Sequence, residues 1–406
     1  MDGYNYPSTH LGQDLVHSER KRFNYLFAGR RWRKTTYMSM FMFRNARKYK
    51  GEYLWASPTH DQNKIALNYM EKMGGKHIEV NRSSMIATIS NGSLIRFRSL
   101  VKPDNARGFT IDGVCIDEAA YIDGDAFFEV IRPTLMSSLG WAFLGSSPNG
   151  YNWLYDLWVK GDSENTATWR IPSLGVRLEN NQVIRDYNRY ENPDLSFEEV
   201  QSLYDQMPSF SFRQEILCEF IANQLNPFVN IDELCCLPNL TSSQTETIAG
   251  IDFAKTTDYS CISVFDRNKK EEIALIRLPQ IDYTMQLELI NSYIEKFKIK
   301  YICFDATGVG VKLAEDMYSK FGGRVGLDPF TFTNDSKAKL IMDLILFMEK
   351  KRIKFTTDRD SISEFRKFGR IQKQNTVSFE AITGHDDSVC ARALALRVIK
   401  GSGLFV

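Results

Sequence analysis

The first residues that could do chemistry lie near the start of the chain. A buried-strand pattern ends at Gly29, and Lys34-Thr35 follow at the start of a helical pattern. Backbone N–H groups in such a turn, together with the positive end of a helix, attract phosphate oxygens. The lysine would reach the β- and γ-phosphates of a nucleotide, and the threonine hydroxyl would bind Mg²⁺. The pattern predicts a nucleotide site, with Ala28 and Arg33 where the usual phosphate loop has glycine.

Two acids and two hydroxyls would complete this site. Residues 114–116 are apolar and predict a strand that ends in Asp117-Glu118. Asp117 can hold the Mg²⁺ shell, and Glu118 can orient and activate the attacking water. Ser146-Ser147 end a further apolar run, where their hydroxyls could contact the γ-phosphate. Each group alone is typical of an ordinary strand end, but together on strands of one sheet they favour a nucleoside triphosphatase.

A second group of acids lies in the C-terminal half. Asp252 and Asp305 each end an apolar strand pattern, Asp258 follows across a polar turn, and Asp386-Asp387 open the last helical pattern. Clustered carboxylates repel one another unless a cation neutralises them, and all-oxygen ligation suits Mg²⁺ or Mn²⁺. Two ions roughly 3.5–4 Å apart would activate water and stabilise the leaving oxygen of a cleaved phosphodiester.

These residues also have simpler explanations. A lone Asp at a strand end is usually a turn or cap residue, and Asp386-Asp387 after His385 could be simple N-capping. Their order along the chain favours a metal-dependent nuclease, in which His385 is structural. Lys337 opens a predicted helix, where it would lie either near the scissile phosphate or on the surface.

Composition narrows the class of protein. A length of 406 residues predicts two or three domains. The net charge of +1, from 51 basic and 50 acidic residues, excludes a uniformly basic surface, so nucleic-acid binding would need local patches. The 7 cysteines lack Cys-x-x-Cys spacing, which favours a reducing compartment. No apolar stretch approaches the ~20 residues that span a membrane, and the sequence predicts a soluble intracellular protein.

The elements that must position the first site alternate between strands and helices. Strands are predicted at 23–28, 52–57, 94–98, 112–116 and 140–145, and helices at 34–48, 60–73 and 125–135. Residues 77–98 predict an inserted antiparallel hairpin that turns at Asn91-Gly92. This alternation indicates an α/β domain with a mostly parallel sheet and flanking helices.

The pattern changes twice before the second site. Residues 173–225 are polar and aromatic and predict a small helical subdomain, and residues 226–246 predict a linker. From 247 the pattern restarts with a meander of three strands followed by α/β units, the order of a ribonuclease-H-like fold. These elements are predicted as strands at 248–254, 259–266, 271–278, 301–305, 353–356 and 376–382, and as helices at 284–298, 310–321, 335–351 and 386–399.

Four short blocks of the sequence together resemble the large terminase subunit of tailed bacteriophages. They are residues 28–36, 56–59, 107–120 and 145–148, and the resemblance covers nearly the whole chain. It implies a P-loop ATPase domain, a helical lid or linker subdomain, a linker and a ribonuclease-H-like nuclease domain. These correspond to residues 1–172, 173–225, 226–246 and 247–406.

The resemblance also assigns roles to residues. It implies that Arg107 is an arginine finger acting on a neighbouring subunit, that Glu118 is the catalytic acid, and that Gln13 reads adenine. The residues implied to contact the nucleotide are Gln13, Gly29, Arg30, Arg31, Lys34, Thr35, Thr36, Asp117, Ser146 and Ser147. The implied ligands of magnesium at the ATPase site are Thr35 and Asp117. The implied ligands of the nuclease metals are Asp252, Asp258, Asp305, Asp386 and Asp387.

The same resemblance implies cofactors and partners. The cofactors are ATP with Mg²⁺ and, for the nuclease, two Mg²⁺ or Mn²⁺ ions. The motor would push double-stranded DNA into a procapsid and cut concatemeric DNA. It would act as a ring on the portal protein with a small terminase subunit loading the DNA, and would be monomeric when free. It would work in the host cytoplasm, without a membrane and outside the mature virion.

Two other functions fit the residues. The chain could be an ATP-dependent DNA translocase or helicase-like module whose C-terminal carboxylates are only structural. It could also be a nuclease whose phosphate loop binds nucleotide as a structural or regulatory ligand.

Overall fold

The computed structural model describes residues 4–100, 110–253, 259–278, 283–307, 310–373 and 376–401. By their contacts the residues form two compact units. Unit 1 comprises Met1–Gln206 and Phe210–Ala222, and unit 2 comprises Met207–Ser209 and Asn223–Val406. The predicted Arg107 and Asp258 lie outside the described residues.

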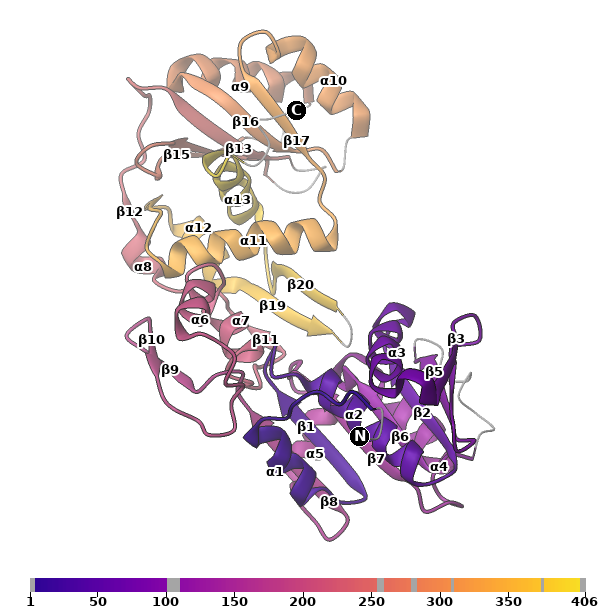
Figure 1. Ribbon diagram of the computed structural model, residues 1–406. Helices are drawn as coiled ribbons and strands as arrows, with labels where there is room; N and C mark the ends of the chain where they lie inside the picture. The colour runs from indigo at the N-terminus through magenta and orange to yellow at the C-terminus, as the bar shows by residue number, and fades with distance from the viewer. Residues whose placement is uncertain are drawn as a thin grey trace. The chain divides into compact units, whose positions relative to one another are not determined.

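Unit 1 is built on an eight-stranded sheet of order β3-β4-β5-β2-β6-β7-β1-β8 (Figure 1). The strands are β1 (Phe23–Ala28), β2 (Glu52–Ser57), β3 (Ile78–Asn81), β4 (Ile86–Ile89), β5 (Leu94–Ser99), β6 (Gly113–Asp117), β7 (Trp141–Ser146) and β8 (Thr166–Ile171). From β5 to β8 every neighbouring pair is parallel, whereas β3, β4 and β5 pair antiparallel. The predicted mostly parallel sheet and its inserted antiparallel segment are confirmed.

Strand β1 is buried on both of its faces, and both are apolar. Leu26 and Ala28 belong to the core cluster that includes Phe43, whereas Tyr25 and Phe27 belong to the cluster on the other side. A strand buried on both faces has a continuous apolar run rather than an alternating one. The residues after β1 therefore leave the sheet from a rigid base.

Helices of different lengths pack against this sheet. They are α1 (Leu11–Glu19), α2 (Lys34–Lys48), α3 (His60–Gly74), η1 (Gly75–His77), η3 (Ala119–Tyr121), η4 (Ala126–Ile131), α4 (Arg132–Thr134) and α5 (Trp153–Lys160). The long helices α2 and α3 start where the sequence predicts. The predicted helix at 125–135 is instead a π-helical segment, η4, followed by the single turn of α4.

The segment predicted as helical at 173–225 is only partly so. It begins with an antiparallel hairpin of β9 (Val176–Glu179) and β10 (Gln182–Arg185). Helices α6 (Phe197–Tyr204) and α7 (Ser209–Glu215) follow. The hairpin turns through Asn180-Asn181, and both residues have positive φ, which asparagine tolerates better than most residues.

Unit 2 is built on a five-stranded sheet of order β15-β14-β13-β16-β17. Its strands are β13 (Thr247–Asp252), β14 (Cys261–Asp266), β15 (Glu271–Arg277), β16 (Ile299–Asp305) and β17 (Gly326–Phe330). The first three form the predicted antiparallel meander, and β16 and β17 join in parallel to β13 and to each other.

Helices lie on both faces of the five-stranded sheet, with α9 and α10 on one side and α13 on the other (Figure 1). The helices of unit 2 are α8 (Ile231–Leu234), α9 (Tyr283–Phe297), α10 (Gly310–Phe321), α11 (Asn334–Glu349), α12 (Arg359–Lys367) and α13 (Asp387–Ile399). Short strands complete the unit, namely β11 (Gln224–Leu225), β12 (Cys235–Leu237), β18 (Phe355–Thr356), β19 (Phe368–Lys373) and β20 (Thr376–Ala381). Residues 226–246, predicted as a linker, thus contain α8 and β12 and belong to unit 2.

Two further expectations concern the environment of the chain. None of the helices in the described ranges combines the length and the apolar character needed to cross a bilayer. All 7 cysteines are free, and only Cys236 is exposed.

Candidate active sites

The turn between β1 and α2 has the backbone shape of a phosphate loop. Arg33, the N-cap of α2, has φ 72° and ψ 35°, and Arg31 has φ 65°. Both residues are therefore left-handed, a conformation that costs a non-glycine residue roughly 1–2 kcal/mol. Arg33 stands where the usual motif has glycine, so this chain keeps the loop geometry with a strained residue.

Contacts with one distant segment, residues 190–194, hold this strained loop. Asn192 Nδ2 donates to the Arg31 carbonyl at 2.7 Å, and Trp32 Nε1 donates to the Tyr190 carbonyl at 2.9 Å. The Arg33 side chain forms an ion pair with Asp194. Sequence reasoning missed these supports. The one signal was Trp32, whose side chain is fully buried although it belongs to a polar loop.

Residues before α1 and in its first turn complete the support. His10 Nε2 lies 3.1 Å from the Trp32 carbonyl oxygen, and Gln13 Nε2 donates to the Arg33 carbonyl at 3.3 Å. The structure therefore places Gln13, predicted to read adenine, against the backbone of the loop.

Gly29 is required by the close approach of a neighbouring segment. A Cβ at this position would lie 2.2 Å from Ser173 Oγ and 2.7 Å from the Ile216 carbonyl oxygen. The next residue, Arg30, donates its backbone N–H to the Glu215 carbonyl at 2.7 Å, and the Arg30 side chain lies 3.5 Å from the Glu215 carboxylate. The loop is thus fixed at its start as well as at its end.

The predicted magnesium ligands of the first site are in direct contact. Thr35 Oγ1 donates to Asp117 Oδ2 at 2.7 Å, and Lys34 Nζ donates to the Ala28 carbonyl at 2.9 Å. Burial, and then the charge of Glu118, raises the pKa of Asp117 to about 6, although Thr35 and Lys34 act to lower it. A hydroxyl and a desolvated carboxylate form an oxygen donor set that fits Mg²⁺.

The acid predicted to activate water lies beside the predicted γ-phosphate contacts. Glu118 has φ 52° and accepts a hydrogen bond from Ser146 Oγ at 3.4 Å. Ser146 Oγ also accepts from the Ala120 N–H at 3.2 Å. Ser147 is hydrogen-bonded to Tyr121, whose pKa burial raises to about 12. The ends of β1, β6 and β7 thus converge on one site.

Three further predicted nucleotide contacts, Arg30, Arg31 and Thr36, differ in their surroundings. The Arg30 and Arg31 side chains are exposed. Thr36 is partly buried and lines a pocket of about 440 Å³ together with Tyr4, Tyr6 and Tyr69.

In unit 2, the register of the sheet places two predicted metal ligands side by side. Ile251 on β13 pairs with Phe304 on the parallel strand β16, so the following residues, Asp252 and Asp305, end neighbouring strands at the same level. Adjacent strands are about 4.8 Å apart. Asp252 also pairs with Cys261 on β14.

Helix α13 covers the face of the sheet that carries these aspartates. A Cβ on Gly250 would lie 2.0 Å from the Ala391 carbonyl oxygen and 2.3 Å from the Ala395 nitrogen, so the helix backbone packs directly on β13. Side chains alternate across a strand, so Asp252 faces the same side as Gly250. Helix α13 begins at Asp387, with Asp386 as its N-cap.

The electrostatics of Asp252 reflect this arrangement. Its side chain still reaches solvent, yet the surrounding protein atoms desolvate it and raise its pKa well above the usual range. The charges of Asp305, Asp387 and Asp386 raise the pKa further, whereas Lys337 acts to lower it. The charges of Asp305, Asp386 and Asp387 are therefore all felt at Asp252, which places the four aspartates in one region of unit 2.

Lys337 supplies positive charge to that region. Its Nζ donates to Asp386 Oδ2 at 2.8 Å. Burial acts to lower the pKa of Lys337, but its interactions with Cys390, Asp386 and Asp252 outweigh burial and raise the pKa. The predicted DNA contact thus lies beside a predicted metal ligand.

The four aspartates are not close enough together to form a complete set of metal ligands. In the ranges that the structure describes, no three His, Cys, Asp or Glu groups are close enough to hold a metal ion together. Like charges repel in the absence of a neutralising cation. The donor set nevertheless fits Mg²⁺ or Mn²⁺, because it consists of carboxylate oxygens. Asp252, the central carboxylate, is costly to ionise without a cation beside it.

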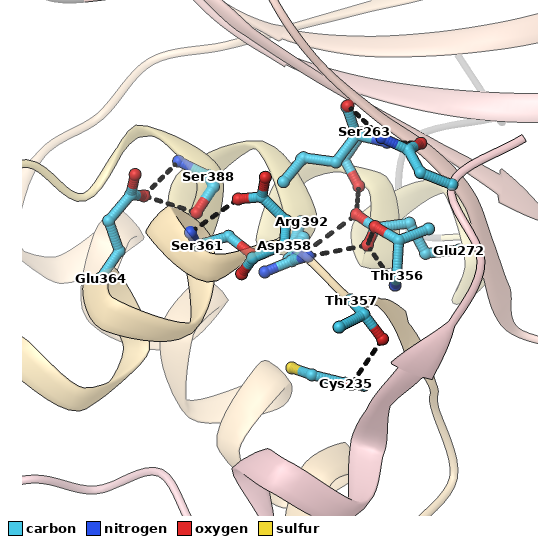
Figure 2. Close-up of polar contacts among 12 residues, drawn as sticks. Cys235, Ser263, Glu272, Thr356, Thr357, Asp358, Ser361, Glu364, Ser388 and Arg392 are labelled. Atoms are coloured by element: carbon cyan, nitrogen blue, oxygen red, sulfur yellow. Dashed lines mark hydrogen bonds and ion pairs between the residues drawn. The ribbon is translucent and has the colours of Figure 1, made fainter. Parts of the chain in front are cut away.

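A buried polar network behind this site was missed by sequence reasoning (Figure 2). Arg392 of α13 donates through Nε and Nη2 to Glu272 at 2.9 and 2.8 Å, and both side chains are 0% exposed. Glu272 also accepts from Ser263 Oγ at 2.6 Å and from Thr356 Oγ1 at 2.7 Å. The sequence signal was an arginine within the apolar run 389–396. Burying such a pair favours full hydrogen bonding, although Arg392 Nη1 has no hydrogen-bond partner among the described residues.

Comparison with known proteins finds two family models that match successive parts of the chain. Residues 25–234 match the model of the terminase large subunit, T4likevirus-type, N-terminal. Residues 249–397 match the model of the terminase RNaseH-like domain. The ribonuclease-H-like order predicted for the C-terminal half is therefore confirmed.

Individual relatives agree with these matches. The terminase large subunit of Thermus virus P23-45 is 30% identical over 333 residues, which cover 76% of this chain and 66% of that protein. This chain therefore spans slightly less than two thirds of that relative's length. Among solved structures, the large terminase of a thermophilic bacteriophage has a TM-score of 0.58 at 14% identity, covering 97% of this chain and 100% of that one. The complex of the same large terminase with ADP has a TM-score of 0.56 at 14% identity, with the same coverage. At this identity the likeness concerns the fold alone, but the two family models together span most of the sequence, and the chain belongs to the terminase large subunit family.

Proposed function

We propose that this chain is a DNA-packaging motor that hydrolyses ATP in unit 1 and cuts DNA with two metal ions in unit 2. The observation that carries the proposal is the presence, on one chain, of a strained phosphate loop in contact with Asp117 and a carboxylate row that begins with Asp252 and Asp305. The ADP complex of the thermophilic bacteriophage's large terminase supports nucleotide use by the fold.

In the ATPase site, Lys34 and the loop N–H groups would hold the phosphates, and Thr35 with Asp117 would hold Mg²⁺. The metal ion would neutralise charge on the β- and γ-phosphates. Glu118 would orient the attacking water and accept its proton, since Ser146 holds the carboxylate at 3.4 Å. Arg107 would act from a neighbouring subunit in a ring on the portal, which predicts slow hydrolysis by the free monomer.

In the nuclease site, Asp252, Asp305, Asp386 and Asp387 would hold two Mg²⁺ or Mn²⁺ ions, with Asp258 as a further ligand. Such ions activate water and stabilise the leaving oxygen. Lys337, already directed at this site by Asp386, would contact a backbone phosphate of the DNA. The substrate would be concatemeric double-stranded DNA in the host cytoplasm, delivered by a small terminase subunit and packaged into a procapsid.

The domain boundaries proposed from the sequence are compatible with this division of labour. Residues 1–172 would form the ATPase and 247–406 the nuclease, and residues 173–225 would act as a lid on the phosphate loop. The contacts of Tyr190, Asn192 and Asp194 with the loop support that last role.

Separation of the two activities tests the proposal. Asp305→Ala should abolish metal-dependent plasmid cleavage and leave ATP hydrolysis at the wild-type rate. Glu118→Ala should do the reverse. If the wild-type protein cuts no DNA with Mg²⁺ or Mn²⁺, a translocase with structural carboxylates is the better description. If Glu118→Ala hydrolyses ATP as fast as the wild type, nucleotide is only a structural or regulatory ligand.

A further inference from the structure

The start of helix α13 is capped in an unusual way. Its N-cap residue, Asp386, makes no side-chain hydrogen bond to the first turn, although aspartate is among the best N-cap residues. The Asp386 carboxylate instead accepts a hydrogen bond from Lys337 Nζ at 2.8 Å. The first N–H groups of the helix must therefore find an acceptor elsewhere.

That acceptor is Glu364, which comes from the neighbouring helix α12 (Figure 2). Glu364 Oε2 accepts the backbone N–H of Ser388 at 2.9 Å and also the Ser388 hydroxyl. Ser388 is fully buried, and the side chain of Glu364 is 12% exposed. The residue before Ser388 is Asp387, so the contact fixes the backbone that carries both Asp386 and Asp387.

The other carboxylate oxygen of Glu364 connects α12 to the five-stranded sheet. Arg277 Nη2 donates to Glu364 Oε1 at 3.2 Å, and Arg277 Nη1 donates to Asp358 Oδ1 at 2.9 Å. Arg277 ends β15 and pairs with Cys261, which in turn pairs with Asp252. Glu364 thus bridges the first turn of α13 and the row of the sheet that ends in Asp252 and Asp305.

We propose that Glu364 is a positioning residue for the nuclease carboxylates, a role that rests on the proposed function of unit 2. By capping α13 in place of Asp386, it leaves that carboxylate to face Lys337 and the metal site instead of the helix N–H groups, and it sets the height of Asp386 and Asp387 over the sheet. Outer residues that orient metal ligands typically change metal affinity by 10–100-fold when they are lost.

The test is Glu364→Gln in the full chain. A glutamine offers one carbonyl oxygen and one amide group, so it can satisfy Ser388 or Arg277 but not both. We expect the Mg²⁺ concentration for half-maximal plasmid cleavage to rise about tenfold. Mn²⁺ binding, titrated calorimetrically without nucleotide, should weaken to a similar extent, with Asp305→Asn defining the signal that does not come from this site. ATP hydrolysis should be unchanged.

A matched control separates positioning from general stability. Asp328→Asn removes the negative charge from the contact with Arg397, which joins the opposite half of α13 to the sheet at 2.7 Å and is similarly shielded, at 17% and 27% exposed. This variant should lower the melting temperature as much as Glu364→Gln does, but leave the metal midpoint unchanged. Ser388→Ala, which keeps the backbone N–H, should shift the midpoint in the same direction by less, and serves if Glu364→Gln does not fold.

The possible results are distinct. An unchanged metal midpoint in Glu364→Gln, or an equal shift in Asp328→Asn, would overturn the positioning role while leaving the nuclease assignment intact. A wild-type chain that cuts no DNA, and whose Mn²⁺ binding is the same in Asp305→Asn, would overturn both.

Discussion

Thr35 and Asp117, 82 residues apart in the sequence, are joined by a hydrogen bond of 2.7 Å from Thr35 Oγ1 to Asp117 Oδ2. The bond links the first turn of α2 to the end of β6. It puts a hydroxyl and a carboxylate where one Mg²⁺ could contact both. Glu118 follows Asp117 directly, so the residue proposed to activate water is placed by the same strand.

Replacement of Glu118 by glutamine tests the proposed role of the acid. The amide keeps the size of the side chain and can still contact Ser146, but it cannot accept a proton. We expect kcat for ATP hydrolysis to fall by about 10²–10⁴ with little change in ATP binding. The measurement is steady-state phosphate release together with binding of a fluorescent ATP analogue. Glu129→Gln, at an exposed glutamate of the same unit, is the control; equal losses in both variants would count against the assignment.

The pKa of Asp117 predicts how the metal-free protein responds to pH. Burial and Glu118 raise this pKa to about 6, from about 3.9 in an unfolded chain. A raised carboxyl pKa gives stability that is fully present below the unfolded pKa and is lost as pH rises through the folded pKa. The difference corresponds to about 3 kcal/mol at most. Asp117→Asn, which remains neutral, should therefore melt at a higher temperature than the wild type at about pH 8 and at a similar temperature at about pH 4.

Melting curves across this pH range, recorded in EDTA, check the prediction. Addition of Mg²⁺ with ADP should then stabilise the wild type and have little effect on Asp117→Asn, because only a ligand that binds the folded state raises its stability. A variant that melts below the wild type at alkaline pH without metal would contradict the raised pKa.

Asn192→Ala tests whether the segment around residues 190–194 supports the phosphate loop. The change removes the hydrogen bond to the Arg31 carbonyl, worth about 1 kcal/mol, from a loop that holds Arg31 and Arg33 in left-handed conformations. We expect a lower melting temperature and a KM for ATP that rises several-fold. Gln182→Ala, at an exposed residue of β10, should change neither quantity. A wild-type KM in Asn192→Ala would mean that the loop keeps its shape without this segment.

The sequence predicted the elements that position both sites because those elements have strong patterns. Strand β1 is apolar throughout, and α2 follows it directly, so the nucleotide loop between them could be located. The contacts of Tyr190 and Asn192 with that loop could not be predicted, because they join segments roughly 160 residues apart. They are made by the backbone carbonyl of Tyr190 and the side-chain amide of Asn192, and neither group forms a recognisable sequence motif.

Strand β17 was missed for a different reason. Its sequence contains Pro329, which argues against a strand because proline cannot donate a ladder hydrogen bond. The strand lies at the edge of the five-stranded sheet, where proline is tolerated. Glu364 could not have been identified either, because helix α12 itself was not predicted. The role of this glutamate depends on the residues that α12 contacts.

Gly250 provides the sharpest test of how the nuclease site is built. A methyl group at this position would lie 2.0 Å from the Ala391 carbonyl oxygen, and backbone atoms cannot move aside without displacing α13. Gly250→Ala should therefore cost about 1–3 kcal/mol in unit 2 and shift Asp386 and Asp387 away from Asp252. Gly323→Ala is a matched control, because a Cβ there meets nothing within 4 Å.

We expect Gly250→Ala to lose most plasmid cleavage at temperatures where the protein is still folded, and to keep the ATPase rate of the wild type. Circular dichroism at the assay temperature establishes that the chain is folded, and Gly323→Ala should match the wild type in both activities. The close packing of α13 on β13 is what sets the distance between the strand-end aspartates and those at the helix start. If Gly250→Ala retains full cleavage, that distance does not control the chemistry, and the metal ions would have to be held without the helix.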